Sequence, residues 1–419
     1  MQKVLTSLIT IGDELLIGQT IDTNSAWMAQ QLNAAGIWVH RRVSVGDVRE
    51  DIWKALDDES AVSDIILITG GLGPTADDIT KPLLCDYFGG KLVLDQPTLE
   101  HIQYLFEKIF RRAGPMLERN RKQAEVPDVC TILFNRIGTA PGMWFEKNGK
   151  IFVSMPGVPQ EMMGLMTEEV MPRLTTHFRL PAIAHRTVFT FGAGESYIAE
   201  RLTDFEAQLP AAFKLAYLPH YGMVRLRLTA TGEAHQALDK EMDAQFDKLC
   251  ALVDDITVVK EDLTMEAYIG RLLKQKGKTV ATAESCTGGA IAQLLTSIPG
   301  SSAWFKGGVV SYAEEVKEDL LDVPATVIQE AGVVSEAVVT QMVKGTLAHI
   351  RADYAIATSG IMGPDGGTEA VPVGTAWVAV GNREHVTAKQ FRFRYQRGMN
   401  TQLTAINALN LLRLFILEA

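Results

Sequence analysis

The stretch from Asp64 to Lys81, "DIILITGGLGPTADDITK", decides the fold of the N-terminal part of the chain. Its first half is an unbroken apolar run, which is typical of a strand buried on both faces of a sheet. Gly70 and Gly71 follow directly and allow a tight turn that can approach a ligand closely. We therefore predict a parallel sheet with helices on both faces and ligand-binding loops at the carboxyl ends of its strands.

The segments on either side repeat this rhythm of short strands and amphipathic helices. We predict strands over residues 4–12 and 38–46, and helices over 25–36 and 49–61. The expected ligand loops follow "TIG", "SVG" and "LITGG". Alternation of this kind predicts an α/β domain, to which we assign residues 1–172.

The pattern changes from about Arg173 onward. The stretches "HRTVFTFG" and "MVRLRLTATG" alternate apolar and polar residues, as half-exposed strands do, and helical patterns cover 195–209 and 235–253. We predict a small α+β domain over 173–259. An α/β rhythm then resumes and runs to a closing helix, which predicts a third, α/β domain over 260–419.

Length and composition narrow the class of protein. A chain of 419 residues exceeds the roughly 250 to 300 residues of a single core. The net charge of −10 argues against general nucleic-acid binding, which needs clustered Lys and Arg. No window of 18 apolar residues and no secretory start occur, so we expect a cytoplasmic protein that binds no membrane. The four cysteines form no C-x-x-C pair and are expected to be reduced and mostly buried.

The glycine-rich loop after the apolar run is a candidate phosphate site. Backbone N–H groups at Gly70, Gly71 and Gly73 could point at an anion. Asp77 and Asp78 would repel a bare phosphate, and a divalent metal ion between carboxylate and phosphate would remove that conflict. A tight turn whose aspartates cap the next helix is the alternative.

Other polar loops follow strands of the same domain. The candidate nucleotide-binding residues of the domain are Gly12, Asp13, Glu14, Asn24, Gly70, Gly71, Gly73, Thr75, Pro156 and Gly157, and the candidate metal ligands are Asp78 and Asp47. Glu161 lies in the same loops. "ERNRKQA" adds Arg119, Arg121 and Lys122 as possible phosphate counter-charges, with a solvated helix face as the alternative.

A second candidate site begins at "AESCTGG", where Ser285 and Cys286 are adjacent possible nucleophiles. The third domain has only two histidines, His349 and His385, and neither lies in a glycine-rich loop, which disfavours a Ser-His-Asp triad. A desolvated lysine can act as the base instead. "SYAEEVK" supplies Tyr312 at the end of a predicted strand and Lys317 on the turn beyond it; a strand-end aromatic and a solvated charge are the alternative.

These motifs carry a resemblance that covers the whole chain in order. "TIGDELLIGQTIDTNSAWMA", "TGGLGPTADDITK" and "PGVPQEM" resemble the N-terminal, molybdopterin-binding-like domain of the CinA (competence/damage-inducible protein A) family. "AESCTGG", "SYAEEVK" and "SGIMGPDGGTEAVPVGTAWVA" resemble its C-terminal nicotinamide mononucleotide deamidase domain. The middle segment resembles the KH-like domain of the family, although its "GAGES" is not the GXXG of nucleic-acid-binding KH domains.

The resemblance implies two activities and a homodimer. The first domain would hydrolyse ADP-ribose to AMP and ribose 5-phosphate with a divalent metal (Mg, Mn or Co), using Asp78 and, less closely matched, Asp47. The third domain would hydrolyse nicotinamide mononucleotide to nicotinate mononucleotide and ammonia without a cofactor. A molybdopterin-like or nucleotide-binding role without turnover, in a competence-related recruitment protein, is the alternative.

The resemblance also assigns residues of the deamidase site. Ser285 would be the nucleophile, Lys317 the general base, and Tyr312 a proton relay or orienting group, with Cys286 packed behind as a small hydrophobe. Arg397 matches a family arginine, but the usual "GDR" reads "YQR" here. The substrate-binding residues that we assign are Thr287, Gly288, Gly289, Ser302, Ser359, Gly360, Gly366 and Arg397.

Overall fold

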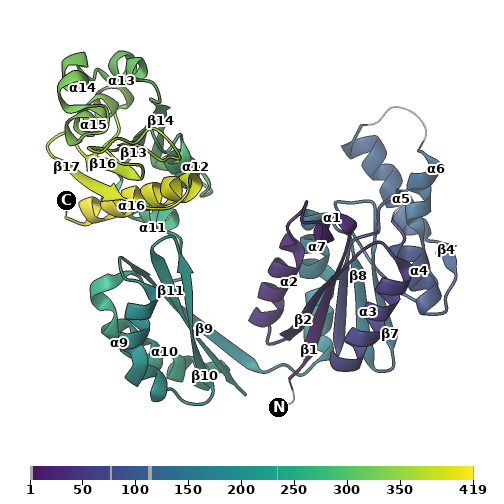
Figure 1. Ribbon diagram of the computed structural model, residues 1–419. Coiled ribbons are helices and arrows are strands. Elements are labelled where there is room, and N and C mark those ends of the chain that lie inside the picture. The colour runs from purple at the N-terminus through teal and green to yellow at the C-terminus, as the bar shows by residue number, and fades with distance from the viewer. Residues whose placement is uncertain (1–2, 76–77, 112–115, 234, 419) are drawn as a thin grey trace. The chain divides into compact units, whose positions relative to one another are not determined.

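The computed structural model describes residues 3–75, 78–111, 116–233 and 235–418 (Figure 1). Asp77 therefore lies outside the described residues. The chain forms two compact units, Met1–Ala184 with Ala230–Lys240 and His185–Thr229 with Glu241–Ala419. Each is described by itself.

The N-terminal domain is built on a six-stranded sheet. Its strand order is β2-β1-β3-β8-β7-β6, with β2, β1, β3 and β8 parallel and the last two strands antiparallel. The strands are β1 (Leu5–Ile11), β2 (Trp38–Val45), β3 (Ile65–Thr69), β6 (Thr131–Leu133), β7 (Gly142–Lys147) and β8 (Lys150–Met155). The predicted parallel arrangement around β3 is confirmed.

Helices cover both faces of this sheet, as predicted. One face packs on α2 (Thr23–Ala34), α7 (Pro159–Leu165) and α8 (Met171–His177), and the other on α3 (Arg49–Val62) and α4 (Thr80–Tyr87). Because β1 and β3 are neighbours whose connections leave in opposite directions, their carboxyl ends form the switch point where α/β sheets bind ligands. The remaining elements are α1 (Asp13–Leu16), α5 (Gln96–Tyr104), α6 (Glu118–Arg121) and the antiparallel pair β4 (Leu92–Leu94) and β5 (Glu125–Pro127).

The middle of the chain forms a four-stranded sheet with two helices. The strand order is β10-β11-β9-β12. The predictions included β9 (Ala182–Phe191), β11 (Met223–Gly232), α9 (Glu195–Ala207) and α10 (His235–Leu252). They did not include β10 (Phe213–His220) or β12 (Thr257–Val259), and β12 has only three residues, too few to show an alternation.

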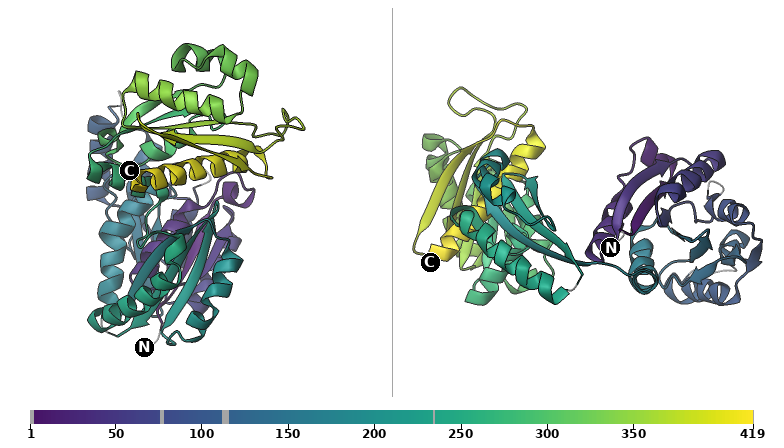
Figure 2. Two further views of the ribbon diagram at one scale, coloured as in Figure 1. Left: turned by 90° about the vertical axis from the view of Figure 1, so that its left-hand side faces the viewer. Right: turned by 90° about the horizontal axis from the view of Figure 1, so that it is seen from below.

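The C-terminal domain has a five-stranded sheet of order β14-β13-β15-β16-β17, in which the first three strands are parallel. In Figure 2 α16 lies on one side of this sheet and the α13–α15 group on the other. The strands are β13 (Val280–Glu284), β14 (Phe305–Val310), β15 (Tyr354–Gly360), β16 (Thr375–Gly381) and β17 (Val386–Arg392). The helices are α11 (Met265–Lys276), α12 (Ala290–Thr296), α13 (Glu314–Leu321), α14 (Ala325–Ala331), α15 (Glu336–Ile350) and α16 (Arg397–Glu418).

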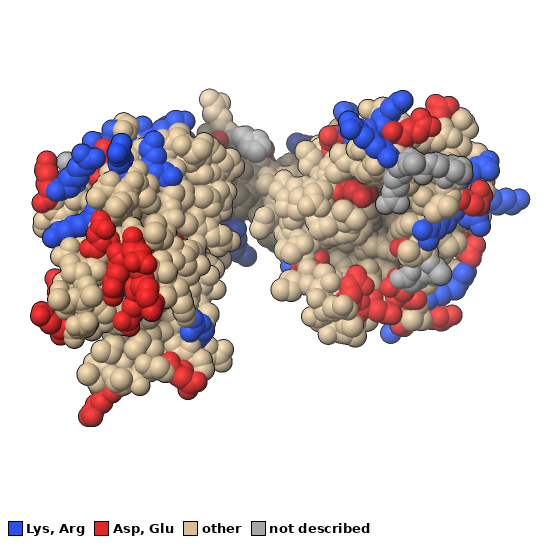
Figure 3. Space-filling model, turned by 90° about the horizontal axis from the view of Figure 1, so that it is seen from above, with Lys and Arg blue, Asp and Glu red and all other residues tan. Residues whose placement is uncertain are grey.

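Charge is spread over the surface in small groups. On the face drawn in Figure 3, acidic and basic side chains lie next to one another at several places, and uncharged surface separates these groups. Within the described ranges, none of the helices combines the length and the apolar character needed to cross a bilayer.

Candidate active sites

The first candidate site is a pocket of ≈ 340 Å³ at the carboxyl ends of β13 and β15. Ser285 follows β13 directly, and Ser359 and Gly360 end β15. The predicted site residues that line the pocket are Ser285, Tyr312, Lys317, Ser359, Gly360, Gly366 and Arg397. These residues come from four separate segments of the sequence, so the fold brings them together.

Lys317 and Ser285 form the centre of this pocket. The Lys317 ammonium donates to the Ser285 Oγ at 3.1 Å, and also to the carbonyl oxygens of Ser311 and Tyr312 at 2.7 and 3.2 Å. Lys317 is 0% exposed, and its burial lowers the pKa of the ammonium, while Glu314 acts in the opposite direction. A buried amine with a lowered pKa next to a hydroxyl is suited to take the proton of a serine nucleophile.

Two local predictions about this pair are wrong. We placed Tyr312 at the end of a strand and Lys317 on the turn beyond it, whereas β14 ends at Val310 and Lys317 lies inside α13. The sequence 314–321 is "EEVKEDLL", and its acidic first turn favours a helix N-terminus. On this helix Lys317 points inward with Leu321, which follows four residues later. Lys317 is therefore held by a helix and not by a turn.

Cys286 lies beside Ser285 but is packed as a hydrophobe. It belongs to a small core cluster with Met362 and Ala376, against which Phe393 packs. Burial raises the pKa of its thiol to about 12. Because the thiolate is the reactive form of cysteine, a neutral thiol at this position is a poor nucleophile at neutral pH.

Glu284, which the sequence analysis did not single out, fixes the turn after β13. Its buried carboxylate accepts from the backbone N–H groups of Gly289, Ile291 and Ala292 at 3.0, 3.0 and 2.8 Å. The N–H groups at the start of α12 therefore already have a hydrogen-bond acceptor inside the protein. A side chain of this kind is hard to find from sequence, because the carboxylate sits inside an apolar strand pattern.

This capping limits which backbone groups can contact a substrate. The Gly288 N–H donates to the Ser285 carbonyl, and the Gly289 N–H to Glu284. In the described chain no backbone or side-chain oxygen accepts from the N–H of Cys286 or Thr287. Of these two residues Cys286 lines the pocket, so its N–H group is an available donor for an oxyanion.

Arg397 and Tyr312 form the outer wall of the pocket. The Arg397 guanidinium donates to the Gly363 carbonyl at 2.8 Å and to the Tyr312 hydroxyl at 3.0 Å. Asn400 is fully buried one turn later and ties this start of α16 to the Met362 carbonyl at 3.0 Å. Arg397, whose two preceding residues depart from the family motif, is thus anchored at the pocket.

Four predicted substrate residues do not line the pocket. Thr287 is buried, where its hydroxyl pairs with that of Thr358 at 2.8 Å, and Gly288 and Gly289 form the turn behind it. Ser302 is exposed in a 3-10 turn. Gly363, which belongs to the glycine-rich segment after β15, also lines the pocket, and the lining residues that the sequence analysis missed are Glu314, Val333, Val334, Ile361, Met362 and Asp365.

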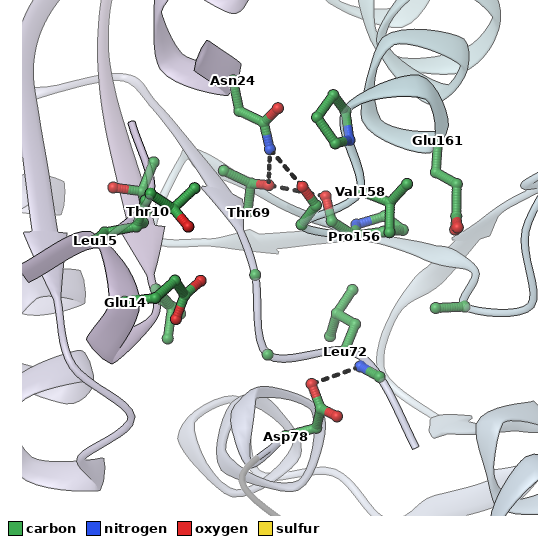
Figure 4. A pocket seen from close by; sticks show the side chains of 18 of the residues that line it. Thr10, Glu14, Leu15, Asn24, Thr69, Leu72, Asp78, Pro156, Val158 and Glu161 are labelled. Atoms are coloured by element: carbon green, nitrogen blue, oxygen red, sulfur yellow. Dashed lines mark hydrogen bonds between the residues drawn. The ribbon is translucent and has the colours of Figure 1, made fainter. Parts of the chain in front are cut away.

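The second candidate site is a pocket of ≈ 430 Å³ at the switch point of the N-terminal sheet. Figure 4 shows Thr10 and Glu14 from the β1 end, Thr69 from β3, and Pro156 and Glu161 from beyond β8 around one opening. The predicted residues that line it are Glu14, Asn24, Gly70, Gly71, Gly73, Asp78, Pro156 and Gly157. Gly12, Asp13, Thr75 and Asp47 are not among its lining residues.

Hydrogen bonds join the start of α2 to the ends of β3 and β8 in this pocket. The Asn24 amide donates to the Thr69 hydroxyl at 3.2 Å and to the Gly157 carbonyl at 2.8 Å, and Thr69 donates to the Pro156 carbonyl at 2.8 Å (Figure 4). Gly70 has a φ of 112°, and a Cβ there would collide with the Ile11 carbonyl. The glycine at this position is therefore required by the close packing of β1 and β3.

Acidic side chains line this pocket from three directions. Glu14, Asp78 and Glu161 are all drawn around its opening in Figure 4. The Glu161 carboxylate accepts from the Asn135 amide at 2.7 Å, and burial raises the pKa of its carboxyl group.

Few described side chains are placed to coordinate the expected metal ion. Among the described residues no group of three or more His, Cys, Asp and Glu side chains is placed to hold an ion. Asp78 accepts from the Gly73 and Thr75 N–H groups, both at 2.8 Å, and Asp47 shares reciprocal 3.3 Å contacts with Asp13 at the neighbouring loop. Mg²⁺ often takes one or two carboxylates and completes its shell with water and substrate phosphate, and Asp78 fits that type of site.

Comparison with known proteins gives the family. Residues 262–416 match the CinA C-terminal domain, 7–176 the "Probable molybdopterin binding domain", and 185–253 the "Damage-inducible protein CinA KH domain". A CinA-like protein of Cytophaga hutchinsonii is 44% identical over 98% of this chain and 97% of its own length. The chain belongs to the CinA family. A CinA-like protein of Chloroherpeton thalassium is 40% identical over 98% and 99% of the two chains.

A solved structure of a CinA superfamily protein from Klebsiella pneumoniae is also similar. It is 33% identical, with a TM-score of 0.36, and the match covers 37% of this chain and 97% of that one. The domain matches confirm the predicted three-domain CinA architecture, with molybdopterin-binding-like, KH-like and CinA C-terminal domains in that order.

Proposed function

We propose that the C-terminal domain hydrolyses the carboxamide of nicotinamide mononucleotide to give nicotinate mononucleotide and ammonia. The observation that carries the proposal is the fully buried Lys317 ammonium, 3.1 Å from the Ser285 hydroxyl, in the lining of one pocket. Amide hydrolysis needs a nucleophile, a base and an oxyanion site, and this pocket has a candidate for each.

Each group has a defined part in the reaction. Neutral Lys317 takes the Ser285 proton as the Oγ attacks the carboxamide carbon, and then returns it to the departing ammonia. The N–H group of Cys286 stabilises the oxyanion. Water, deprotonated by the same lysine, then cleaves the acyl-serine ester to release the carboxylate and restore the Ser285 hydroxyl.

The wall opposite the nucleophile suits the sugar phosphate. Arg397 uses two N–H groups on Gly363 and Tyr312 and keeps others for a phosphate oxygen. Gly360 and Gly366 line the same pocket. A phosphorylated ribose would therefore contribute binding energy that free nicotinamide lacks.

Ammonia release by the full chain tests this function. We expect turnover of nicotinamide mononucleotide and, because the phosphate contact is missing, at least about 100-fold lower kcat/KM for free nicotinamide. Absence of ammonia release from both amides would overturn the proposal. Equal turnover of the two would remove Arg397 from the substrate site.

For the N-terminal domain we propose the hydrolysis of ADP-ribose to AMP and ribose 5-phosphate. Asp78 would hold a divalent ion together with phosphate oxygens, and the ion would supply charge neutralisation at the diphosphate. The specific support is that Gly70, Gly71 and Gly73 and the Asn24–Thr69 network meet at one pocket. The alternative is binding of a nucleotide or pterin without turnover.

AMP formation separates these two possibilities. Turnover of ADP-ribose with added Mg²⁺ or Mn²⁺, lost on chelation, supports hydrolysis, whereas binding without AMP formation supports the binding module.

Because both proposed substrates are small nucleotides, we also propose that the protein is a cytoplasmic enzyme. Its resemblance to the family favours a homodimer.

A further inference from the structure

A smaller pocket of ≈ 220 Å³ adjoins the pocket of the N-terminal domain. The two pockets share one wall, because Gly71, Leu72, Gly73, Pro74, Asp78 and Gln123 line both. A ligand that crosses the glycine loop could therefore occupy both pockets at once.

The smaller pocket is the cationic one. Lys81, Arg119 and Lys122 line it together with two acidic residues, Asp78 and Glu125. The larger pocket has no Lys, Arg or His among its described lining residues, and it combines acidic side chains with Leu15, Ile21, Leu72 and Val158. An anionic group thus finds its counter-charges only on one side of the shared wall.

The cationic side chains of the smaller pocket have N–H groups that can bind a ligand. The Lys81 ammonium is 8% exposed and donates to the carbonyl oxygens of Gln123 at 2.8 Å and Lys122 at 3.3 Å, which leaves its third N–H for a ligand. Arg119 and Lys122 are exposed, and neither forms an ion pair with any acidic side chain that the structure describes. Asp78, by contrast, already accepts from the Gly73 and Thr75 N–H groups.

We propose that this smaller pocket binds the distal phosphoryl group and its sugar in a nucleoside diphosphate ester, while the nucleoside occupies the larger pocket. The diphosphate would then cross the glycine wall beside Asp78. This orientation leaves the AMP part of ADP-ribose in the larger pocket and the ribose phosphate part next to Lys81, Arg119 and Lys122. The inference rests on the function proposed for the N-terminal domain.

Binding measurements on the full chain test the orientation. We expect Arg119→Ala and Lys122→Ala each to weaken the binding of ADP-ribose by about tenfold, with the affinity for adenosine unchanged. The effect on AMP should be smaller, because AMP lacks the distal phosphoryl group. Arg121→Ala is the matched control, since Arg121 lies on the same short segment but pairs with Glu118 at 3.9 Å and does not line the pocket.

The outcomes separate the inference from the function on which it rests. If the unmodified chain binds none of the three ligands with or without Mg²⁺, the proposed nucleotide site is wrong and the orientation with it. If it binds ADP-ribose and the Arg119 and Lys122 variants bind it equally well, the orientation alone is overturned. An equal loss for AMP and ADP-ribose would also overturn it, because the cations would then contact the proximal phosphate.

Discussion

Lys317→Met is expected to lower kcat for nicotinamide mononucleotide by about 10³-fold while leaving the fold intact, because a general base contributes roughly 10² to 10⁴ in rate. Methionine matches the length of the buried lysine stem but cannot take a proton. The fully buried ammonium also costs desolvation free energy, so the variant should unfold at an equal or higher temperature. Ammonia release and thermal unfolding, measured on the same preparation, check both parts.

Two further variants test whether the loss of activity is specific to the basic amine of Lys317. Lys344→Met, which removes an exposed lysine of α15, should retain full activity. Lys317→Arg should stay inactive at every pH, because guanidinium does not deprotonate in proteins. Activity of the Lys317→Met variant close to that of the unmodified chain would contradict the proposed role.

The pH dependence follows from the state of the same lysine. The reactive form is the neutral amine, so kcat/KM rises as the pH passes upward through the pKa of Lys317. Burial holds that pKa below the usual 10.5 of lysine. We therefore expect the acid limb of the pH profile at a lower pH than an exposed lysine would give.

Glu284→Ala is expected to destabilise the C-terminal domain by about 3 kcal/mol, because it removes the acceptor of three backbone N–H groups, one buried and two partly buried. The start of α12 would lose its partners, and the turn that carries Ser285 would lose its anchor. The lowest thermal unfolding transition of the full chain measures this change.

A conservative variant and a control variant test whether the loss of stability comes from the Glu284 carboxylate. Glu284→Gln keeps one acceptor oxygen and should lose less stability than the alanine variant. Glu330→Ala, at an exposed position of α14, should leave the unfolding temperature within experimental error. An unchanged transition in Glu284→Ala would mean that the carboxylate does not hold this helix start.

The fold was predictable where apolar periodicity is strong. The run at 65–69 and its glycines predict the buried parallel strand β3, and the helical patterns at 25–36 and 49–61 predict α2 and α3. The short strand β12 and the helices α13 to α15 were not predicted. The segments of β12, α13 and α14 are brief, whereas α15 has 15 residues with apolar residues at helical spacing and could have been predicted.

The candidate sites were predictable in their chemistry more than in their detailed contacts. Ser285 and Lys317 meet as expected, but the sequence pattern does not reveal that α13 carries the lysine or that Glu284 occupies the donors of α12. Gly288 and Gly289 suggest an anion-binding site, because glycine lets the backbone approach a ligand closely. Only the three-dimensional structure shows which N–H groups are already paired.

The central claim is that Ser285, activated by Lys317, attacks the carboxamide while Cys286 is a structural neighbour. The rate of ammonia release from nicotinamide mononucleotide by Ser285→Ala and Cys286→Ala, compared with the unmodified chain, tests it most directly. We expect at least about 10³-fold loss for Ser285→Ala and less than about threefold loss for Cys286→Ala. Retained activity in Ser285→Ala, or a comparable loss in a folded Cys286→Ala, would contradict the account.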